Sequence, residues 1–106
     1  MFVTGKEIIA KEVSPGIFRK ILTYNDKLMV CEFLIKKGAV LKEHHHINLQ
    51  NTYVISGKLE FSVNGETRVV TDGDSILMEE DAPHSVVGLE DTRVIDVFSP
   101  MRKDFL

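Results

Sequence analysis

Three of the four histidines stand in a row, at His44, His45 and His46, and a glutamine follows at Gln50. Alternate side chains of a β-strand face the same way, so His44 and His46 would project to one side of a strand and His45 to the other. Two neutral imidazoles on one face can bind the same metal ion. The spacing therefore predicts a metal site in which His45 takes no part.

Gln50 can join such a site only if the chain folds back after the histidines. An extended chain would carry Gln50 roughly 13 Å from His46, at about 3.3 Å per residue. Donors that bind one ion at about 2.0 to 2.2 Å lie within ~3 Å of each other. The reversal would fall at Ile47, Asn48 and Leu49, where asparagine is a suitable turn residue.

The fourth histidine, His84, follows a short apolar run and an Asp-Ala-Pro segment. Pro83 fixes its own φ and biases Ala82 toward an extended conformation, so the chain enters His84 in a defined direction. The candidate metal donors are therefore His44, His46, Gln50 and His84. They predict a divalent transition metal as cofactor, and nickel, zinc, iron, manganese and cobalt all suit such donors, so the metal stays open.

Short strands must position these donors. Turn signals recur every eight to twelve residues, and the runs between them are rich in Val, Ile, Phe, Leu and Thr. That spacing is typical of an all-β sandwich or barrel. In the clearest hairpin, Asn64 and Gly65 supply the positive φ angles of a type I′ turn and predict that residues 58–63 pair with residues 66–71.

A carboxylate lies on an apolar stripe near the end of the chain. In the predicted strand "TRVIDVFS", Val94, Asp96 and Phe98 share one face. Asp96 is either an acid–base group or a structural carboxylate that holds a loop or a histidine ligand in place. The tail after Pro100 is either a short helical turn or extended.

The composition is that of an ordinary globular protein. The 106 residues, 43% of them hydrophobic and 27% charged, show no shift or repeat that would divide them, and predict one domain over residues 1–106. A net charge of −3 without a basic stripe argues against nucleic acid as a partner. Cys31, the single cysteine, is predicted to be buried. Without a leader-like or long apolar run at the N-terminus, we expect a cytoplasmic protein with no membrane partner.

The histidine spacing resembles the first motif of the cupins, which is Gly, five residues, His, one residue, His, three or four residues, Glu, six residues, Gly. The matching positions are Gly38, His44, His46, Gln50 and Gly57. The only departure is glutamine in place of glutamate.

The second cupin motif is matched in part. Gly73 and His84 stand at its ends, whereas Glu79 and Asp81 stand where the family has proline and glycine. Together the two motifs imply a double-stranded β-helix, or jelly-roll, barrel with a metal bound inside it. They also imply a homodimer.

A narrower resemblance covers most of the chain. "QNTYVISGKLEF" and "VIDVFSPMRKDFL" look like the pectin-degradation cupins of KdgF type, which carry glutamine as the fourth ligand and end in D-V-F-S-P-x-R. Members of that family convert 4,5-unsaturated uronates, the products of pectate and alginate lyases, into their linear keto form. The resemblance implies a small anionic sugar acid as substrate and Asp96, Phe98 and Arg102 as catalytic residues in its pocket.

The donor set suits an anionic substrate. Glutamine in place of glutamate leaves a divalent ion its full charge, which attracts a carboxylate, and Arg102 could add a bidentate grip. Two other functions stay open. An iron dioxygenase would use similar donors, although its chemistry often adds a carboxylate that Gln50 denies. The second is a non-catalytic cupin that binds a sugar or another small molecule.

Overall fold

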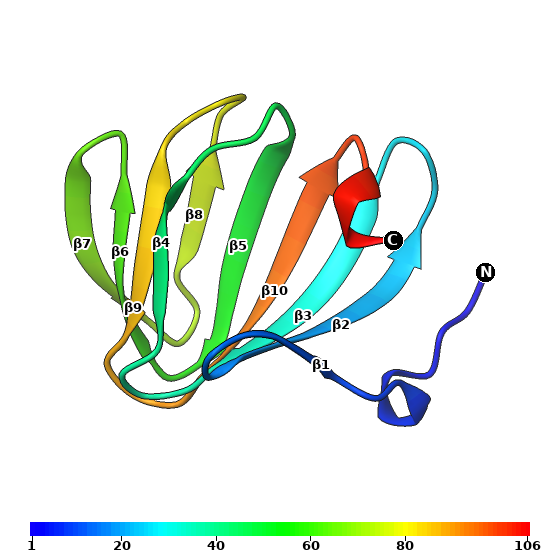
Figure 1. Ribbon diagram of the computed structural model, residues 1–106, viewed down its shortest axis with the longest axis horizontal. Coiled ribbons are helices and arrows are strands. Elements are labelled where there is room, and N and C mark those ends of the chain that lie inside the picture. The colour runs from blue at the N-terminus through cyan, green and yellow to red at the C-terminus, as the bar shows by residue number, and fades with distance from the viewer.

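Ten β-strands form two antiparallel sheets that face each other (Figure 1). The computed structural model describes all residues from 1 to 106. The strands are β1 (Lys11–Ser14), β2 (Ile17–Tyr24), β3 (Met29–Ile35), β4 (Val40–His44), β5 (Leu49–Ser56), β6 (Lys58–Val63), β7 (Glu66–Thr71), β8 (Ser75–Met78), β9 (His84–Gly88) and β10 (Thr92–Ser99). The order is β1-β2-β3-β10-β5-β8 in the first sheet and β4-β9-β6-β7 in the second. The all-β prediction is confirmed.

The predicted hairpin is confirmed. β6 and β7 pair antiparallel, with Val63 opposite Glu66 at the turn. Asn64 and Gly65 have φ angles of 50° and 80°, as a type I′ turn requires. Local turn chemistry is therefore enough to set the register of these two strands.

The core lies between the sheets. Along β10 the residues that face it are buried at every second position, which confirms that Val94, Asp96 and Phe98 share a face. The main apolar cluster is Ile17, Ile35, Ala39, Val54, Leu59, Phe61, Val70, Met78, Ala82, Val86 and Val94. Cys31 is fully buried in a smaller cluster with Met29 and Phe98, as predicted.

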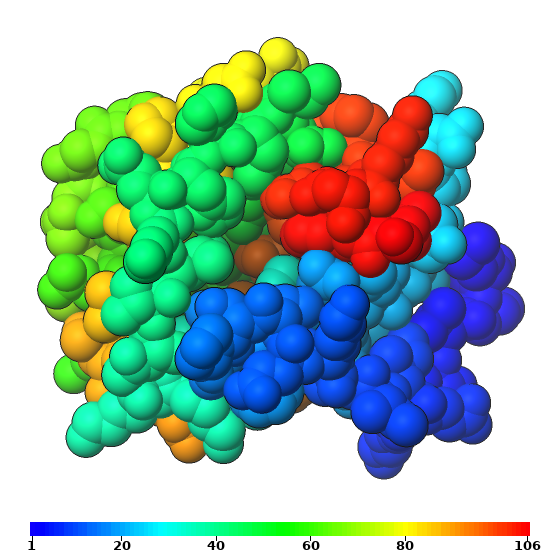
Figure 2. Space-filling model, viewed as in Figure 1, coloured from blue at the N-terminus to red at the C-terminus, as the bar shows by residue number.

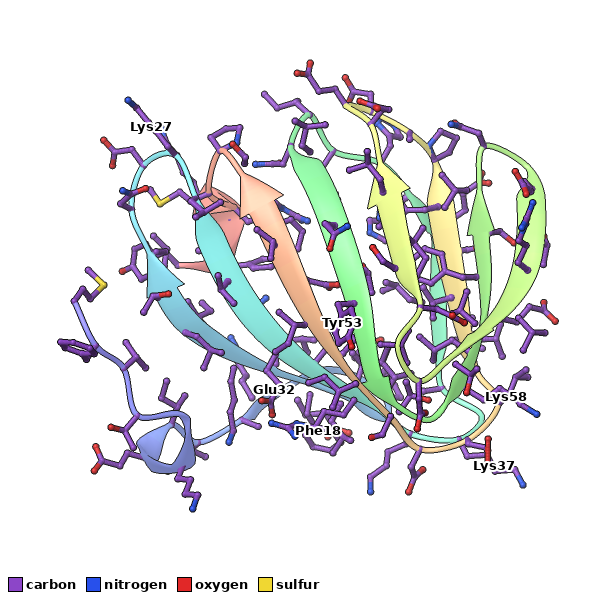
Figure 3. All side chains as sticks on the ribbon, turned by 180° about the vertical axis from the view of Figure 1, so that it is seen from behind. Phe18, Lys27, Glu32, Lys37, Tyr53 and Lys58 are labelled. Carbon is purple, nitrogen blue, oxygen red and sulfur yellow. The ribbon has the colours of Figure 1, made fainter.

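The other face of the six-stranded sheet is turned away from the core. In Figure 3, which shows the molecule from behind, the labelled side chains Phe18, Glu32 and Tyr53 lie on this outer face. Tyr53 is 47% exposed. The inward face therefore carries the alternate residues of β2, β3, β5 and β10.

The chain ends in a short 3₁₀ helix, Lys103–Phe105, which settles the tail as a helical turn. It lies over β3 and β10 in Figure 1, where the ring of Phe105 meets those of Phe33 and Phe98 edge to face. The only other helix, Gly5–Glu7, also has three residues, and neither helix is long and apolar enough to cross a membrane. The C-terminal turn thus forms one wall of the space between the sheets.

Candidate metal centre

Three histidines converge at the edge of the four-stranded sheet. His44 is the last residue of β4 and His84 the first of β9, and the two lie opposite each other in the antiparallel pair. His46 follows in the loop after β4. One ring nitrogen from each of the three lies within 4.8 Å of the other two, a spacing that could hold a metal ion.

The prediction that His44 and His46 lie on one strand is wrong. β4 ends at His44, and the chain bends at Ile47 and Asn48 before β5 begins at Leu49. The alternation rule holds only while the backbone stays extended, so it does not describe His46. The reversal itself falls where the sequence predicted it.

Backbone carbonyls fix the tautomer of all three rings. Each Nδ1 lies 2.8 to 3.0 Å from a carbonyl oxygen; the pairs are His44 with Lys42, His46 with Asn48 and His84 with Ala82. Because a carbonyl only accepts, each Nδ1 carries the proton and each Nε2 presents a lone pair. Nε2 of His84 is buried and has no hydrogen-bond partner. A cation at the centre of the cluster would satisfy it.

A chain of hydrogen bonds orients Gln50. Its amide nitrogen donates to the hydroxyl of Thr52 over 3.1 Å, and that hydroxyl donates to Asp96. Oε1 of Gln50 therefore faces Nε2 of His46, 2.9 Å away. Neither atom has a proton to share, and this separation matches the ~3 Å between two donors to one ion. The residues present thus fit a divalent metal held by three imidazoles and an amide oxygen.

The local electrostatics keep two of the imidazoles neutral. The pKa of His84 is lowered to about 4, mainly by burial; the nearby His44, His46 and Arg102 act in the same direction, and the hydrogen bond to the Ala82 carbonyl opposes them. Burial and Arg102 also lower the pKa of His46. Neutral imidazole is the form that binds a metal, so at neutral pH these rings need not lose a proton first.

Asp96 lies next to this cluster on β10. It is buried, and burial raises the pKa of its carboxyl to about 6. The hydrogen bond from Thr52, the nearby amide of Gln50 and the charge of Arg102 act to lower the pKa. Phe98, two residues on, is also buried, and its ring meets that of His46 edge to face at a centroid distance of 5.8 Å. Both side chains thus face the predicted donors.

A cavity of about 230 Å³ connects most of the predicted residues. Its lining includes His44, Gln50, His84, Asp96, Phe98 and Arg102. In the space-filling view a hollow opens between the β4–β5 segment in green, the C-terminal turn in red and the first strands in blue (Figure 2). A larger groove along β6, β7 and β8 is lined by none of these residues.

Arg102 lies at the cavity in a paired state. Its guanidinium donates two hydrogen bonds to Asp104, of 2.8 and 3.0 Å, and lies 4.3 Å from the ring centre of Phe105. Among the other side chains that line the cavity, Arg19, Thr52 and Phe105 are close to the site and were not identified by sequence reasoning. Thr52 has the same strand parity as Gln50, which was the signal available for it.

Comparison with known proteins places these features in a family. Residues 31–98 match the family model described as the cupin domain. The chain is 42% identical over 98 residues to the pectin degradation protein KdgF of Dickeya dadantii, which covers 91% of this chain and 89% of that protein.

Two solved structures are similar over nearly the whole chain. KdgF from a Halomonas species superposes with a TM-score of 0.96 at 37% identity, covering 100% of this chain and 98% of that one. An RmlC-like cupin from Shewanella frigidimarina gives a TM-score of 0.96 at 32% identity, covering 99% and 95%. The predicted cupin fold is confirmed, and the chain belongs to the cupin family, among its KdgF-like members.

Proposed function

We propose that this protein binds a divalent transition metal and promotes the opening of a 4,5-unsaturated uronate ring to the linear keto form. Two similar proteins are KdgF proteins, and one of them is named for pectin degradation. The observation that carries the proposal is that the donors His44, Gln50 and His84 line one cavity with the buried carboxylate of Asp96.

The reaction is an isomerisation that needs no oxidant or reductant. The anomeric hydroxyl loses its proton, the bond between C1 and the ring oxygen breaks, and C1 becomes a carbonyl. The electron pair left on the former ring oxygen makes an enolate at C5, which becomes a ketone as C4 takes up a proton. The reaction therefore needs a group that accepts the proton of the anomeric hydroxyl and a group that gives a proton to C4. A single group could do both.

Asp96 is suited to take the proton from the anomeric hydroxyl and to give one to C4. It is the only carboxylate among the residues that line the cavity, and the hydrogen bond from Thr52 holds it in one orientation. A positioned carboxylate within reach of the substrate contributes typically 10²- to 10⁴-fold to rate as a general acid or base. The structural role considered for Asp96 is compatible with this one, because the same carboxylate also orients Thr52.

The other residues would hold the substrate and the ion. His44, His46, Gln50 and His84 would hold a divalent metal, which supplies a Lewis acid for the oxygen that gains charge. The ring of Phe98 lines the cavity beside His46 and would present an apolar surface to the substrate. The guanidinium of Arg102, paired with Asp104, forms part of the wall that a uronate would face.

The test follows the ultraviolet absorbance of the 4,5-unsaturated chromophore with unsaturated galacturonate. We expect metal-loaded wild type to remove it quickly and Asp96→Asn to approach the rate in buffer, with metal content unchanged. Asp26→Asn, an exposed change that breaks no side-chain hydrogen bond, is the matched control. Wild-type decay no faster than in buffer would contradict the proposal, and oxygen consumption by the iron-loaded protein would indicate a dioxygenase.

A further inference from the structure

Strand β2 places a charged side chain on the inward face of the six-stranded sheet. Ile17 and Ile21 both pack into the interior, and Arg19 lies between them with the same parity. Phe18, its neighbour, lies on the outer face in Figure 3. The side chain of Arg19 accordingly lines the same cavity as the donor cluster and Asp96.

Arg19 differs from the other arginines in having no carboxylate partner. The paired ones are Arg68 with Glu66, Arg93 with Glu32 and Arg102 with Asp104. Arg19 instead donates one hydrogen bond of 3.3 Å to the backbone oxygen of Phe105 and stacks on its ring, 4.1 Å from the ring centre. Four of its five N–H donors have no partner in the protein. A partly buried guanidinium in this state favours an anion.

A comparison with Arg102 shows which of the two guanidinium groups is free to bind an anion. Both guanidinium groups contact the ring of Phe105, at 4.1 and 4.3 Å from its centre. Two donors of Arg102 are committed to Asp104, whose negative charge compensates it. Arg19 therefore carries the uncompensated positive charge of the cavity.

We propose that Arg19 binds the carboxylate group of the substrate, an inference that rests on the proposed function for the identity of the uronate. A planar guanidinium matches the two oxygens of a carboxylate and can donate to both. In this arrangement Arg19 determines specificity for an acid over a neutral sugar. Arg102, held by Asp104 and Phe105, forms part of the cavity wall.

The experiment separates binding from turnover. Calorimetry with the Zn²⁺-loaded protein would compare galacturonate, which lacks the double bond, with its uncharged methyl ester. A hydrogen-bonded charge pair is worth about 1.5 to 3 kcal/mol, so Arg19→Gln should weaken galacturonate binding about tenfold or more and leave ester binding within about twofold. Arg19→Lys should restore part of the preference for the acid. The matched control is Arg93→Gln, which makes the same charge change on the outer face.

The outcomes distinguish this inference from the proposed function. Equal loss of acid and ester binding in Arg19→Gln, or no loss of either, would overturn the role of Arg19. A selective loss of acid binding would support it, even if the unsaturated chromophore then proved stable, in which case only the ring-opening reaction would fail. With the unsaturated substrate we expect Arg19→Gln to raise KM about tenfold while kcat changes much less.

Discussion

The hydroxyl of Thr52 donates a hydrogen bond to the carboxylate of Asp96 across the paired strands β5 and β10. Because its proton is committed to Asp96, the Thr52 oxygen can only accept from the amide nitrogen of Gln50. That leaves Oε1 of Gln50 facing His46. A residue that touches no ion thus determines which atom of Gln50 is presented to one.

We expect Thr52→Val to lower metal affinity. Valine keeps the shape of the side chain but cannot orient the amide of Gln50, and the loss of such a supporting hydrogen bond typically costs 10- to 100-fold in metal affinity. Competition with a chromophoric chelator would measure it. Thr52→Ser keeps the hydroxyl and is the control. Equal affinity of the valine and serine variants would show that Thr52 does not orient the ligand.

The three adjacent histidines should differ in their effect on metal content. His45 is exposed, and its ring approaches only the exposed Asp81, at 3.5 Å. His46 has its Nδ1 bound by the Asn48 carbonyl and its Nε2 in the cluster. After purification in the presence of metal, elemental analysis should find His45→Ala fully loaded and His46→Ala depleted of metal. The expected cause is a loss of metal affinity of an order of magnitude or more in His46→Ala. Similar losses in both variants would contradict this division.

The parts of the fold that sequence reasoning predicted are those fixed by local rules. Asn64 and Gly65 dictate a turn type by their φ preferences alone, and strict alternation places Val94, Asp96 and Phe98 on one face of β10 whatever lies opposite. The end of β4 follows no such rule. His44, His45 and His46 suit a strand equally well, and the pairing of β4 with β9 decides where the strand stops.

The inward position of Arg19 could not be predicted from the sequence for a related reason. In "IFRKILTY" large apolar residues occur at both parities, so the pattern does not say whether Arg19 or Lys20 faces inward. The answer comes from the pairing of β2 with β3, which sets Arg19 opposite Phe33. The contact with Phe105 depends on a tail whose conformation the sequence left open.

Cys31 should be inert in the folded protein. Burial, and next the charge of Asp96, raise the pKa of its thiol to about 12 against the opposing effect of Arg19 and Arg102. At pH 8 only about one molecule in 10⁴ would carry a thiolate, the form that reacts with iodoacetamide. Mass spectrometry should find the native thiol unmodified under conditions that alkylate the guanidinium-denatured protein fully. Comparable rates in the two states would mean that this part of the core opens readily.

Gly57 and Gly65 both lie at positive φ, but an added methyl group would clash with its surroundings only at Gly57. Their φ angles are 115° and 80°. A Cβ at Gly57 would overlap Thr92 and the backbone at Asp91, whereas a Cβ at Gly65 would meet nothing within 4 Å. Gly65→Ala should therefore cost only the conformational strain, about 1 kcal/mol, and Gly57→Ala about 3 kcal/mol or more.

Urea denaturation of the two glycine variants would give this difference directly. The clash at Gly57 falls where Thr92 begins β10, and its hydroxyl already bonds the backbone of Lys58 and Glu90, so the strand cannot move away without losing those bonds. β10 also carries Asp96, so Gly57→Ala should lower the proposed ring-opening activity as well as stability. Equal free energies of unfolding for the two variants would mean that the start of β10 yields to the added methyl group.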